Sequence, residues 1–320
     1  MSIISTVTVT VPATTANLGP GFDCIGAALT MYNHFQFSQL EEVGTLKISA
    51  TGAEAAKVKT DDSNLAYQSF VKLYEYLGQS PPSVVIDISL GVPLARGLGS
   101  SATAIAAGLV AGNYLAGKPL TQVEVMQLAI AIEGHPDNVV PALLGGCRLA
   151  ASKEDPPQPP LGKEGLRGFD WEICDIPWHP NIVPVVAIPD FELSTSEARK
   201  VLPSDYSRAD AIFNAAHLGL LLRGLETGNP DWLRSAMQDK IHQPYRQALI
   251  KGYSAVRQAA IAAGAYEMAI SGAGPTLLAL ADADVATAVA AAMAQAWLQQ
   301  GVRAEVRSLG LDTEGTRITA

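Results

Sequence analysis

The chain has 320 residues, of which 48% are hydrophobic, and it carries a formal net charge of −9 at pH 7. This length suits two domains or one large domain, and the apolar fraction is sufficient for a full core. The acidic balance argues against a nucleic-acid-binding protein, and the sequence holds no apolar run of about 18 residues to cross a membrane. The first 11 residues lack the basic and apolar segments of a secretory signal, so we expect a cytoplasmic protein.

In the first half of the chain, apolar alternation predicts strands at 6–11, 45–51 and 84–89. Helical periodicity predicts helices at 64–77, 103–116 and 121–133. Residues 153–168 are rich in Pro, Gly and charge, which is typical of an exposed loop, and we expect a domain boundary there.

In the second half, the same signals predict strands at 182–188, 266–271, 276–281 and 302–307. They predict helices at 207–226, 230–237, 245–263 and 284–299. The alternation of strands and helices, with adjacent antiparallel strands, indicates an α+β sandwich.

The most informative stretch lies between the predicted strand 84–89 and a predicted Ala-rich helix, and reads Pro93-Leu94-Ala95-Arg96-Gly97-Leu98-Gly99-Ser100-Ser101-Ala102. The first N–H groups of a helix lack intrahelical partners and carry the positive end of its dipole, so this position suits a phosphate group. Glycine lets the backbone approach a ligand closely, and the two serines can cap the helix, bind phosphate or ligate Mg²⁺.

Other interpretations of glycine-rich segments stay open at this point. The first is a structural turn in which a serine is the helix N-cap. The second is a dinucleotide fingerprint, because residues 97–102 fit G-x-G-x-x-G/A, but that motif belongs after the first strand of a βαβ unit. The third is a Walker P-loop at 112–118, where Pro119 replaces the Mg²⁺-binding hydroxyl and the position indicates a helix C-terminal stop.

The stretch 93–102 resembles the second motif of the GHMP small-molecule kinases, P-x-x-x-G-L-G-S-S-A. Two further segments resemble the other family motifs and occur in the family's order, V-P-A-T-T-A-N-L-G-P-G-F-D at 11–23 and I-S-G-A-G-P-T at 270–276. The resemblance covers almost the whole chain. It implies two domains, an N-terminal domain like ribosomal protein S5 domain 2 at 1–165 and a ferredoxin-like domain at 166–320.

The same resemblance implies that ATP is the phosphoryl donor and that the loop wraps its phosphates. The implied nucleotide-binding residues are Asn64, Pro93, Leu94, Ala95, Arg96, Gly97, Leu98, Gly99, Ser100, Ser101, Ala102 and Thr103. Asn64 matches the residue of the adenine pocket, although by itself it is also a good N-cap for the helix that follows.

The run I-E-G-H-P-D-N-V-V-P-A at 132–142 resembles E-G-H-P-D-N-V-x-P-A of the homoserine kinases, a branch of the GHMP kinases. By itself, Glu133 reads as an ordinary helix C-terminal residue and His135 as a satisfied loop histidine. The resemblance implies that Glu133 and Ser101 bind Mg²⁺, with Ser100 as the alternative to Ser101. It also implies the activity of an ATP:L-homoserine O-phosphotransferase, which yields ADP and O-phospho-L-homoserine on the route to threonine.

An L-homoserine site has to recognise an α-carboxylate and an α-ammonium together. The planar fork of Arg suits the carboxylate and Asp suits the ammonium. Runs 194–199 and 243–246 resemble the family and imply that Arg199 and Arg246 hold the carboxylate, although each arginine alone reads as a solvated surface charge. The resemblance also implies that Asp23 binds the ammonium. The further substrate contacts that it implies are Asn17, His135, Thr195 and Gly272.

Phosphoryl transfer needs positioning and charge neutralisation more than covalent chemistry. We expect no dedicated general base, and we expect Asn138 and Arg199 to assist catalysis beside Glu133 and Ser101. The alternatives are mevalonate or phosphomevalonate kinase activity, whose substrates lack an ammonium, and a non-catalytic ligand sensor on the same fold. We expect no nucleic-acid or membrane partner, and the sequence leaves a homodimer open.

Overall fold

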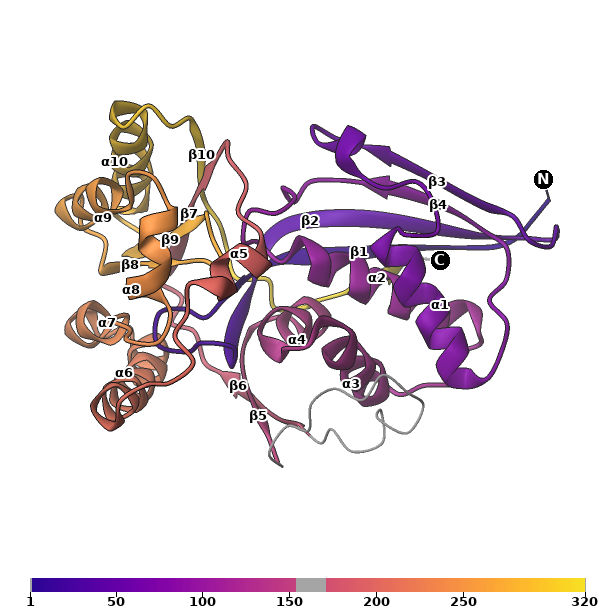
Figure 1. The fold of residues 1–320 in the computed structure, drawn as a ribbon, viewed down its shortest axis with the longest axis horizontal. Coiled ribbons are helices and arrows are strands. Elements are labelled where there is room, and N and C mark those ends of the chain that lie inside the picture. Colours follow the sequence, from indigo (N-terminus) through magenta and orange to yellow (C-terminus); the bar gives the residue numbers. More distant parts are fainter. Residues whose placement is uncertain (1, 154–170, 320) are drawn as a thin grey trace.

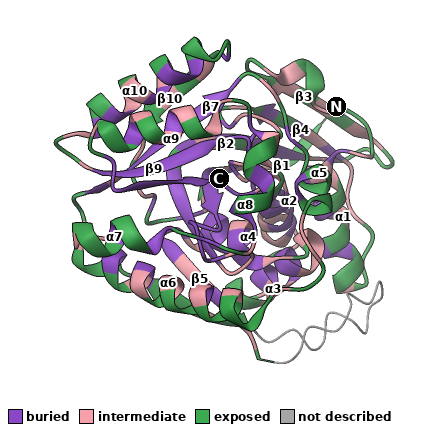
Figure 2. Ribbon diagram, turned by 60° about the vertical axis from the view of Figure 1, so that its left-hand side comes forward, coloured by how far each residue is buried: buried purple, intermediate pink, exposed green. Residues whose placement is uncertain are grey.

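The computed structural model describes residues 2–153 and 171–319 (Figure 1). These residues form two sheets, one of seven strands and one of four. The central strands are buried, and the helices around them present exposed outer surfaces (Figure 2). In this part of the chain, every helix is too short or too polar to cross a bilayer.

The larger sheet is built on two long antiparallel strands, β1 (Ile3–Ala16) and β2 (Ile25–Leu40). Its path runs β11-β1-β2-β4-β3, and β5 pairs with both β2 and β6. The remaining strands are β3 (Leu46–Thr51), β4 (Val84–Ser89), β5 (Cys147–Ser152), β6 (Trp171–Ile176) and β11 (Arg317–Thr319). Val7, Val9 and Val11, which are alternate residues of β1, lie in one core with the helices. The burial of these apolar side chains fixes which face of the sheet the helices cover.

Four helices share a core with this sheet: α1 (Leu65–Leu77), α2 (Ser100–Leu115), α3 (Gln122–Glu133) and α4 (Pro136–Leu144). Helices α2 and α4 lie against its strands, and α1 and α3 pack on these two helices. The helix α2 is rich in small residues and is buried against α1. A Cβ at Gly108 would lie 2.1 Å from the carbonyl oxygen of Ala66 in α1. This close packing fixes the axis of α2 and therefore the position of its N-terminus.

The smaller sheet has the order β10-β7-β9-β8 and is antiparallel throughout. Its strands are β7 (Ile182–Pro189), β8 (Glu267–Ile270), β9 (Leu277–Asp282) and β10 (Ala304–Ser308). One face packs on α9 (Tyr253–Ala262) and α10 (Ala286–Gln299), which share a core with Val185 and Ala187 of β7. The other helices of this half are α5 (Thr195–Lys200), α6 (Arg208–Thr227), α7 (Pro230–Ala236) and α8 (Gln243–Arg246).

A second core joins the two halves of the molecule. It combines Leu18, Ile25 and Leu98 of the first half with Val186 of β7 and with apolar residues of α6 and α7. The chain also returns to the first sheet, because β6 pairs with β5 and β11 pairs with β1. The domain boundary predicted between 165 and 166, and all but Lys153 of the predicted loop 153–168, fall outside the described residues.

The structure confirms an α+β fold and most predicted elements. The strand predicted at 84–89 has the same bounds as β4, and α2 begins three residues earlier than the predicted 103. The single helix predicted at 245–263 is wrong. Ile250 is extended there and Gly252 has a φ of +81°, so the chain forms α8, a short 3-10 turn at Gln247–Leu249 and then α9.

Candidate active site

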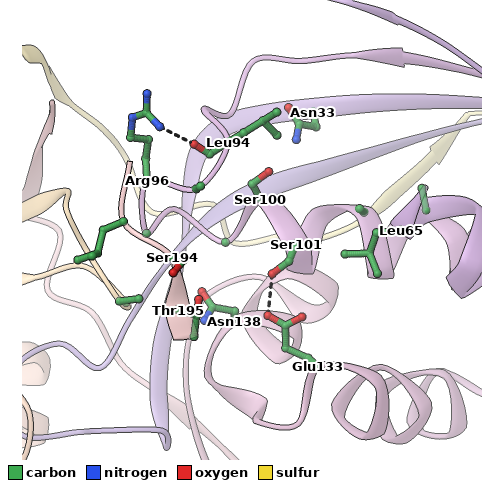
Figure 3. Close-up of a pocket in the computed structure, with 18 of the residues that line it drawn as sticks. Asn33, Leu65, Leu94, Arg96, Ser100, Ser101, Glu133, Asn138, Ser194 and Thr195 are labelled. Atoms are coloured by element: carbon green, nitrogen blue, oxygen red, sulfur yellow. Dashed lines mark hydrogen bonds between the residues drawn. The ribbon is translucent and has the colours of Figure 1, made fainter. Parts of the chain in front are cut away.

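The three motif segments meet between the two halves of the molecule. The N–H of Thr14 donates to the carbonyl of Leu98 at 3.1 Å, which joins the first motif to the second. The N–H of Thr276 donates to the carbonyl of Arg96 at 3.2 Å, which joins the third motif to the second. All three segments line a cavity of about 580 Å³. Figure 3 shows the part of its wall that the second segment forms.

The glycine-rich loop leads directly into α2. Gly99 is the N-cap residue with a φ of +66°, and within the described chain no side chain caps this helix. The first intrahelical hydrogen bond runs from Thr103 N–H to Gly99 carbonyl at 2.9 Å, so the N–H groups before Thr103 have no partner inside the helix. The interpretation of a serine as N-cap is therefore wrong, and the amides are available to an anion.

Gly99 is required by the surrounding protein as well as by its backbone angle. A Cβ at this position would lie 1.9 Å from Oγ1 of Thr14 and 3.1 Å from Oδ1 of Asn138. The Thr14 hydroxyl donates to that same Asn138 oxygen at 2.7 Å. The loop therefore lies directly on the first motif and on α4, and a side chain would separate them.

Ser101 and Glu133 form an oxygen-rich pair at the N-terminus of α2. The Ser101 hydroxyl donates to Oε1 of Glu133 at 2.7 Å (Figure 3). Burial raises the pKa of Glu133 above its usual range, and the charge of His135 and the hydrogen bond from Ser101 offset this only in part. A hydroxyl and a carboxylate beside a phosphate-binding helix end are hard oxygen ligands, so this pair fits Mg²⁺.

The segment between α3 and α4 supplies a second polar cluster. His135 is the N-cap residue of α4, and its Nδ1 lies 2.5 Å from Oδ1 of the buried Asp137. Burial lowers the pKa of His135, but the hydrogen bond to Asp137 and the charges of Asp137 and Glu133 outweigh it and raise the pKa. Asp23, His135 and Asp137 also place ligand atoms within 4.8 Å of one another, so they are a second group with metal-ligand chemistry.

Another part of the cavity wall holds two arginines and one carboxylate. Arg199 donates to both oxygens of Asp23, at 2.8 and 2.9 Å. Arg246 is only 2% exposed, and its guanidinium donates to the carbonyls of Ala198 and Gly272. Burial and the charge of Arg199 lower the pKa of Arg246. Both guanidinium groups also lie over the ring of Phe22, at 5.6 and 5.0 Å from its centroid.

The turn between β1 and β2 presents Asp23 to this site. Asn17 and Asp23 have positive φ angles of 74° and 56°, which are uncommon for residues other than glycine. Asn17 supports the turn, since its Oδ1 accepts from the N–H of Asp23 at 3.0 Å and its Nδ2 donates to Gly272 at 2.8 Å. Backbone strain held by surrounding contacts is typical of functional sites.

Most of the predicted site residues lie in the cavity wall: Asn17, Asp23, Asn64, Leu94, Ala95, Arg96, Gly97, Gly99, Ser100, Ser101, Glu133, His135, Asn138, Thr195, Arg199, Arg246 and Gly272. Four others, Pro93, Leu98, Ala102 and Thr103, fall outside the described residues that line it. The structure confirms Asn64 as the N-cap of α1, and its place in the adenine pocket stays a prediction. The residue lines the cavity and also caps α1, accepting from the N–H groups of Ala66 and Tyr67.

Sequence reasoning missed Asn33, which is buried in β2 at the cavity wall. Its Oδ1 accepts from the N–H groups of Gly91 and Val92, and its Nδ2 donates to Thr103 at 2.9 Å. Asn33 thus joins β2 to the start of the loop and to α2. The signal available was an amide in the middle of an otherwise apolar and aromatic run, M-Y-N-H-F.

Comparison with known proteins extends the resemblance. Residues 64–146 match the GHMP kinases N terminal domain and residues 221–299 match the GHMP kinases C terminal domain. A homoserine kinase of Trichormus variabilis is 70% identical over 315 residues, which are 98% of this chain and 99% of that protein. A homoserine kinase of Nostoc punctiforme is 67% identical over 317 residues, covering 99% of both chains.

Solved structures give the same picture. The crystal structure of homoserine kinase from Cytophaga hutchinsonii matches with a TM-score of 0.84 at 26% identity, covering 100% of this chain and 99% of that one. Mevalonate kinase of L. major, solved with R-mevalonate, matches with a TM-score of 0.69 at 15% identity over 95% of both chains, which shows a shared fold.

Proposed function

This chain belongs to the homoserine kinase family of the GHMP kinases, and we propose that its two substrates meet in the cavity between the three motif segments. The enzyme transfers the γ-phosphoryl group of ATP to the side-chain hydroxyl of L-homoserine, a step of threonine biosynthesis. The residue roles below assign each part of that reaction to a part of the cavity.

The nucleotide binds at the loop end of the cavity. The free N–H groups at the start of α2 and the backbone of Gly97 and Gly99 receive the phosphates, because a helix N-terminus favours negative charge. The adenine lies toward the opposite wall, where Asn64 stands among the apolar side chains of Phe35, Leu65 and Ile88.

Ser101 and Glu133 would hold Mg²⁺ between the phosphates and the amino acid. When bound, the ion would supply charge neutralisation for the triphosphate. The Ser101 hydroxyl and the Glu133 carboxylate already lie 2.7 Å apart, so both are placed for a single ion. The raised pKa of Glu133 reflects an unneutralised carboxylate in a buried place, which a divalent cation would relieve.

L-homoserine binds by exchanging partners with an existing ion pair. The ammonium of L-homoserine pairs with Asp23, and its carboxylate pairs with Arg199 and Arg246. The exchange conserves charge, because the amino acid brings one positive and one negative group to a site that holds both. The Asp23–Arg199 pair is inexpensive to open, since the two side chains are 32% and 39% exposed and such pairs contribute little to stability.

The described carboxylates nearest the reacting groups are already engaged: Asp23 with Arg199, Glu133 with Ser101, and Asp137 with His135. The substrate hydroxyl therefore loses its proton to the transferred phosphoryl group or to solvent. Asn138, whose Oδ1 is fixed by the Thr14 hydroxyl, orients the acceptor hydroxyl, and Arg199 stabilises the developing charge.

One observation carries the choice of acceptor, namely two guanidinium groups and one carboxylate that face the same cavity as the phosphate loop. ADP release should be measured with L-homoserine, D-homoserine and mevalonate at equal enzyme concentration. We expect strong stimulation by L-homoserine alone. A higher kcat/KM for mevalonate, which has no ammonium, would contradict the assignment.

A further inference from the structure

Arg96 stands at a position of the loop motif, P-x-x-x-G, that the pattern leaves unspecified. The residue is 6% exposed. Its side chain extends away from Ser100 and Ser101, although it belongs to the same loop (Figure 3). Such a large buried cation needs a set of acceptors, and these acceptors identify its role.

Each N–H group of the Arg96 guanidinium has an acceptor within reach. Nε donates to the carbonyl of Pro189 at 3.0 Å. Nη1 donates to the carbonyl of Leu94 at 2.9 Å and lies 3.2 Å from the Glu192 carboxylate. Nη2 donates to Glu54 at 3.4 Å and to the carbonyl of Asp190 at 3.3 Å. A guanidinium has five N–H donors, so none is left for a phosphate oxygen.

Glu54 completes the arrangement from the other side of the loop. Its Oε2 accepts from the N–H of Leu94 at 2.6 Å, while the Leu94 carbonyl accepts from Arg96. Both backbone polar groups of Leu94 are thus held by this one ion pair. The next residue, Ala95, has a φ of +52°, a conformation that a non-glycine residue keeps only when its surroundings impose it.

The same pair connects the two halves of the molecule. Glu54 precedes a short helical turn of the first half, whereas Pro189 and Asp190 lie at the end of β7 in the second half. Lys57 and Glu192 extend the network to solvent and are 49% and 45% exposed. With Arg96 and Glu54 they make two positive and two negative side chains, so the network carries no net charge. Exposed pairs contribute little to stability. The pair between the buried Arg96 and the half-buried Glu54 is therefore the one that holds the loop.

We propose that Arg96 and Glu54 are positioning residues that hold the loop in its phosphate-binding conformation and fix it to the end of β7. The expectation that Arg96 contacts ATP directly is replaced by an indirect role. The inference rests on the proposed function, because it assumes that the loop binds the phosphates of the nucleotide. It differs from a purely structural role in predicting a defect specific to the nucleotide.

Arg257 provides a matched control. It pairs with the buried Glu267 through two hydrogen bonds in the second half, and neither residue is among the described residues that line the cavity. Arg257→Met therefore removes an ion pair that also has one buried partner, without touching the loop. Arg96→Met keeps most of the side-chain volume and removes the donors.

The experiment measures MgADP binding by calorimetry, KM for ATP, KM for L-homoserine and the melting temperature of each variant. Arg96→Met should weaken MgADP binding and raise KM for ATP by about tenfold or more, while KM for L-homoserine stays within about twofold. Arg257→Met should lower the melting temperature and leave both KM values unchanged. Glu54→Ala should resemble Arg96→Met, and Glu54→Gln should be milder because its amide oxygen still accepts from Leu94.

Arg96→Met or Glu54→Ala with a lower melting temperature and a wild-type KM for ATP would overturn the inference. If Arg96→Met does not fold, the two Glu54 variants decide, because they remove the other half of the pair. Wild-type protein that fails to bind MgADP would overturn the proposed function and this inference with it. If the wild-type protein binds MgADP and Arg96→Met binds it equally well, this inference is overturned and the proposed function is not.

Discussion

At the phosphate-loop end of the cavity the binding groups are backbone amides held by buried contacts, whereas at the amino-acid end they are charged side chains that pair with one another. Gly99 lies against Thr14 and Asn138, and α2 is fixed by its close packing on α1. Asp23 and Arg199, by contrast, are partly exposed side chains that form an ion pair with each other. The nucleotide end is thus preformed, and the amino-acid end becomes available when its ion pair exchanges partners.

The largest expected effect comes from Glu133→Gln, which acts where the two ends meet. It removes the carboxylate proposed to hold Mg²⁺, so kcat should fall at least about a hundredfold, or roughly 2.7 kcal/mol of transition-state stabilisation. The melting temperature should change little, because the amide oxygen still accepts from Ser101. The measurement is steady-state kinetics at saturating concentrations of both substrates. A near-normal kcat would contradict the role of Glu133 and would indicate that another carboxylate, such as Asp137, is the metal ligand.

Gly99→Val tests whether the loop end is truly preformed. A side chain would collide with Thr14, and the φ of +66° disfavours any β-branched residue. KM for ATP should rise by more than about tenfold, with a lower melting temperature. Gly117→Val is the matched control, since Gly117 has a φ of +85° but open space around it. Equal changes of KM in both variants would show that the contact with Thr14 has no role in nucleotide binding.

Arg199→Lys tests the amino-acid end in the same way. The lysine keeps the charge but loses the planar fork that bonds both carboxylate oxygens. KM for L-homoserine should rise about tenfold, and KM for ATP should hardly change. Initial rates over a grid of both substrates separate the two constants. A parallel rise of both would place Arg199 in support of the phosphates or of the fold.

The pH dependence should show a smaller effect. Because burial raises the pKa of Glu133, this carboxylate takes up a proton at a higher pH than an ordinary glutamate, whose pKa is 4.5. The ionised form is the one that binds a cation, so kcat/KM for MgATP, which reports the free enzyme, should fall as the pH is lowered through a value above 4.5. The residual activity of Glu133→Gln should lack this acidic limb. A wild-type limb below 4.5 would argue against the role of Glu133.

Local signals in the sequence were sufficient for much of the fold. Helix α1 was predicted within one residue, because Asn64 caps its start and Gly78 ends it with a φ of +70°. The long strand β2 was not predicted, although residues 30–37 alternate between buried and less buried positions; only its first five residues, all buried, lack this signal. The break between α8 and α9 was also missed, although Gly252 inside the predicted helix was a local signal for it.

In the candidate site, too, some features could be predicted from local sequence and others depend on the tertiary fold. The loop and its serines could be assigned from a contiguous motif, and the structure places Ser101 beside Glu133. The pairing of Asp23 with Arg199 could not be predicted, because the two residues are 176 positions apart and only the tertiary fold brings them together. Likewise, no sequence pattern indicates that Arg96 faces Glu54 and the end of β7 rather than the nucleotide.

The central claim is that L-homoserine binds by replacing the Asp23–Arg199 pair, and a substrate analogue tests it most directly. 4-Hydroxybutyrate has the carboxylate and the hydroxyl of homoserine but lacks the ammonium. The measurement is the ratio of kcat/KM for L-homoserine to kcat/KM for 4-hydroxybutyrate, in the wild type and in Asp23→Asn. We predict a ratio of at least about a hundredfold in the wild type and a decrease of about tenfold or more in Asp23→Asn, which loses the ammonium partner and frees Arg199. A ratio that is the same in both proteins would contradict the account.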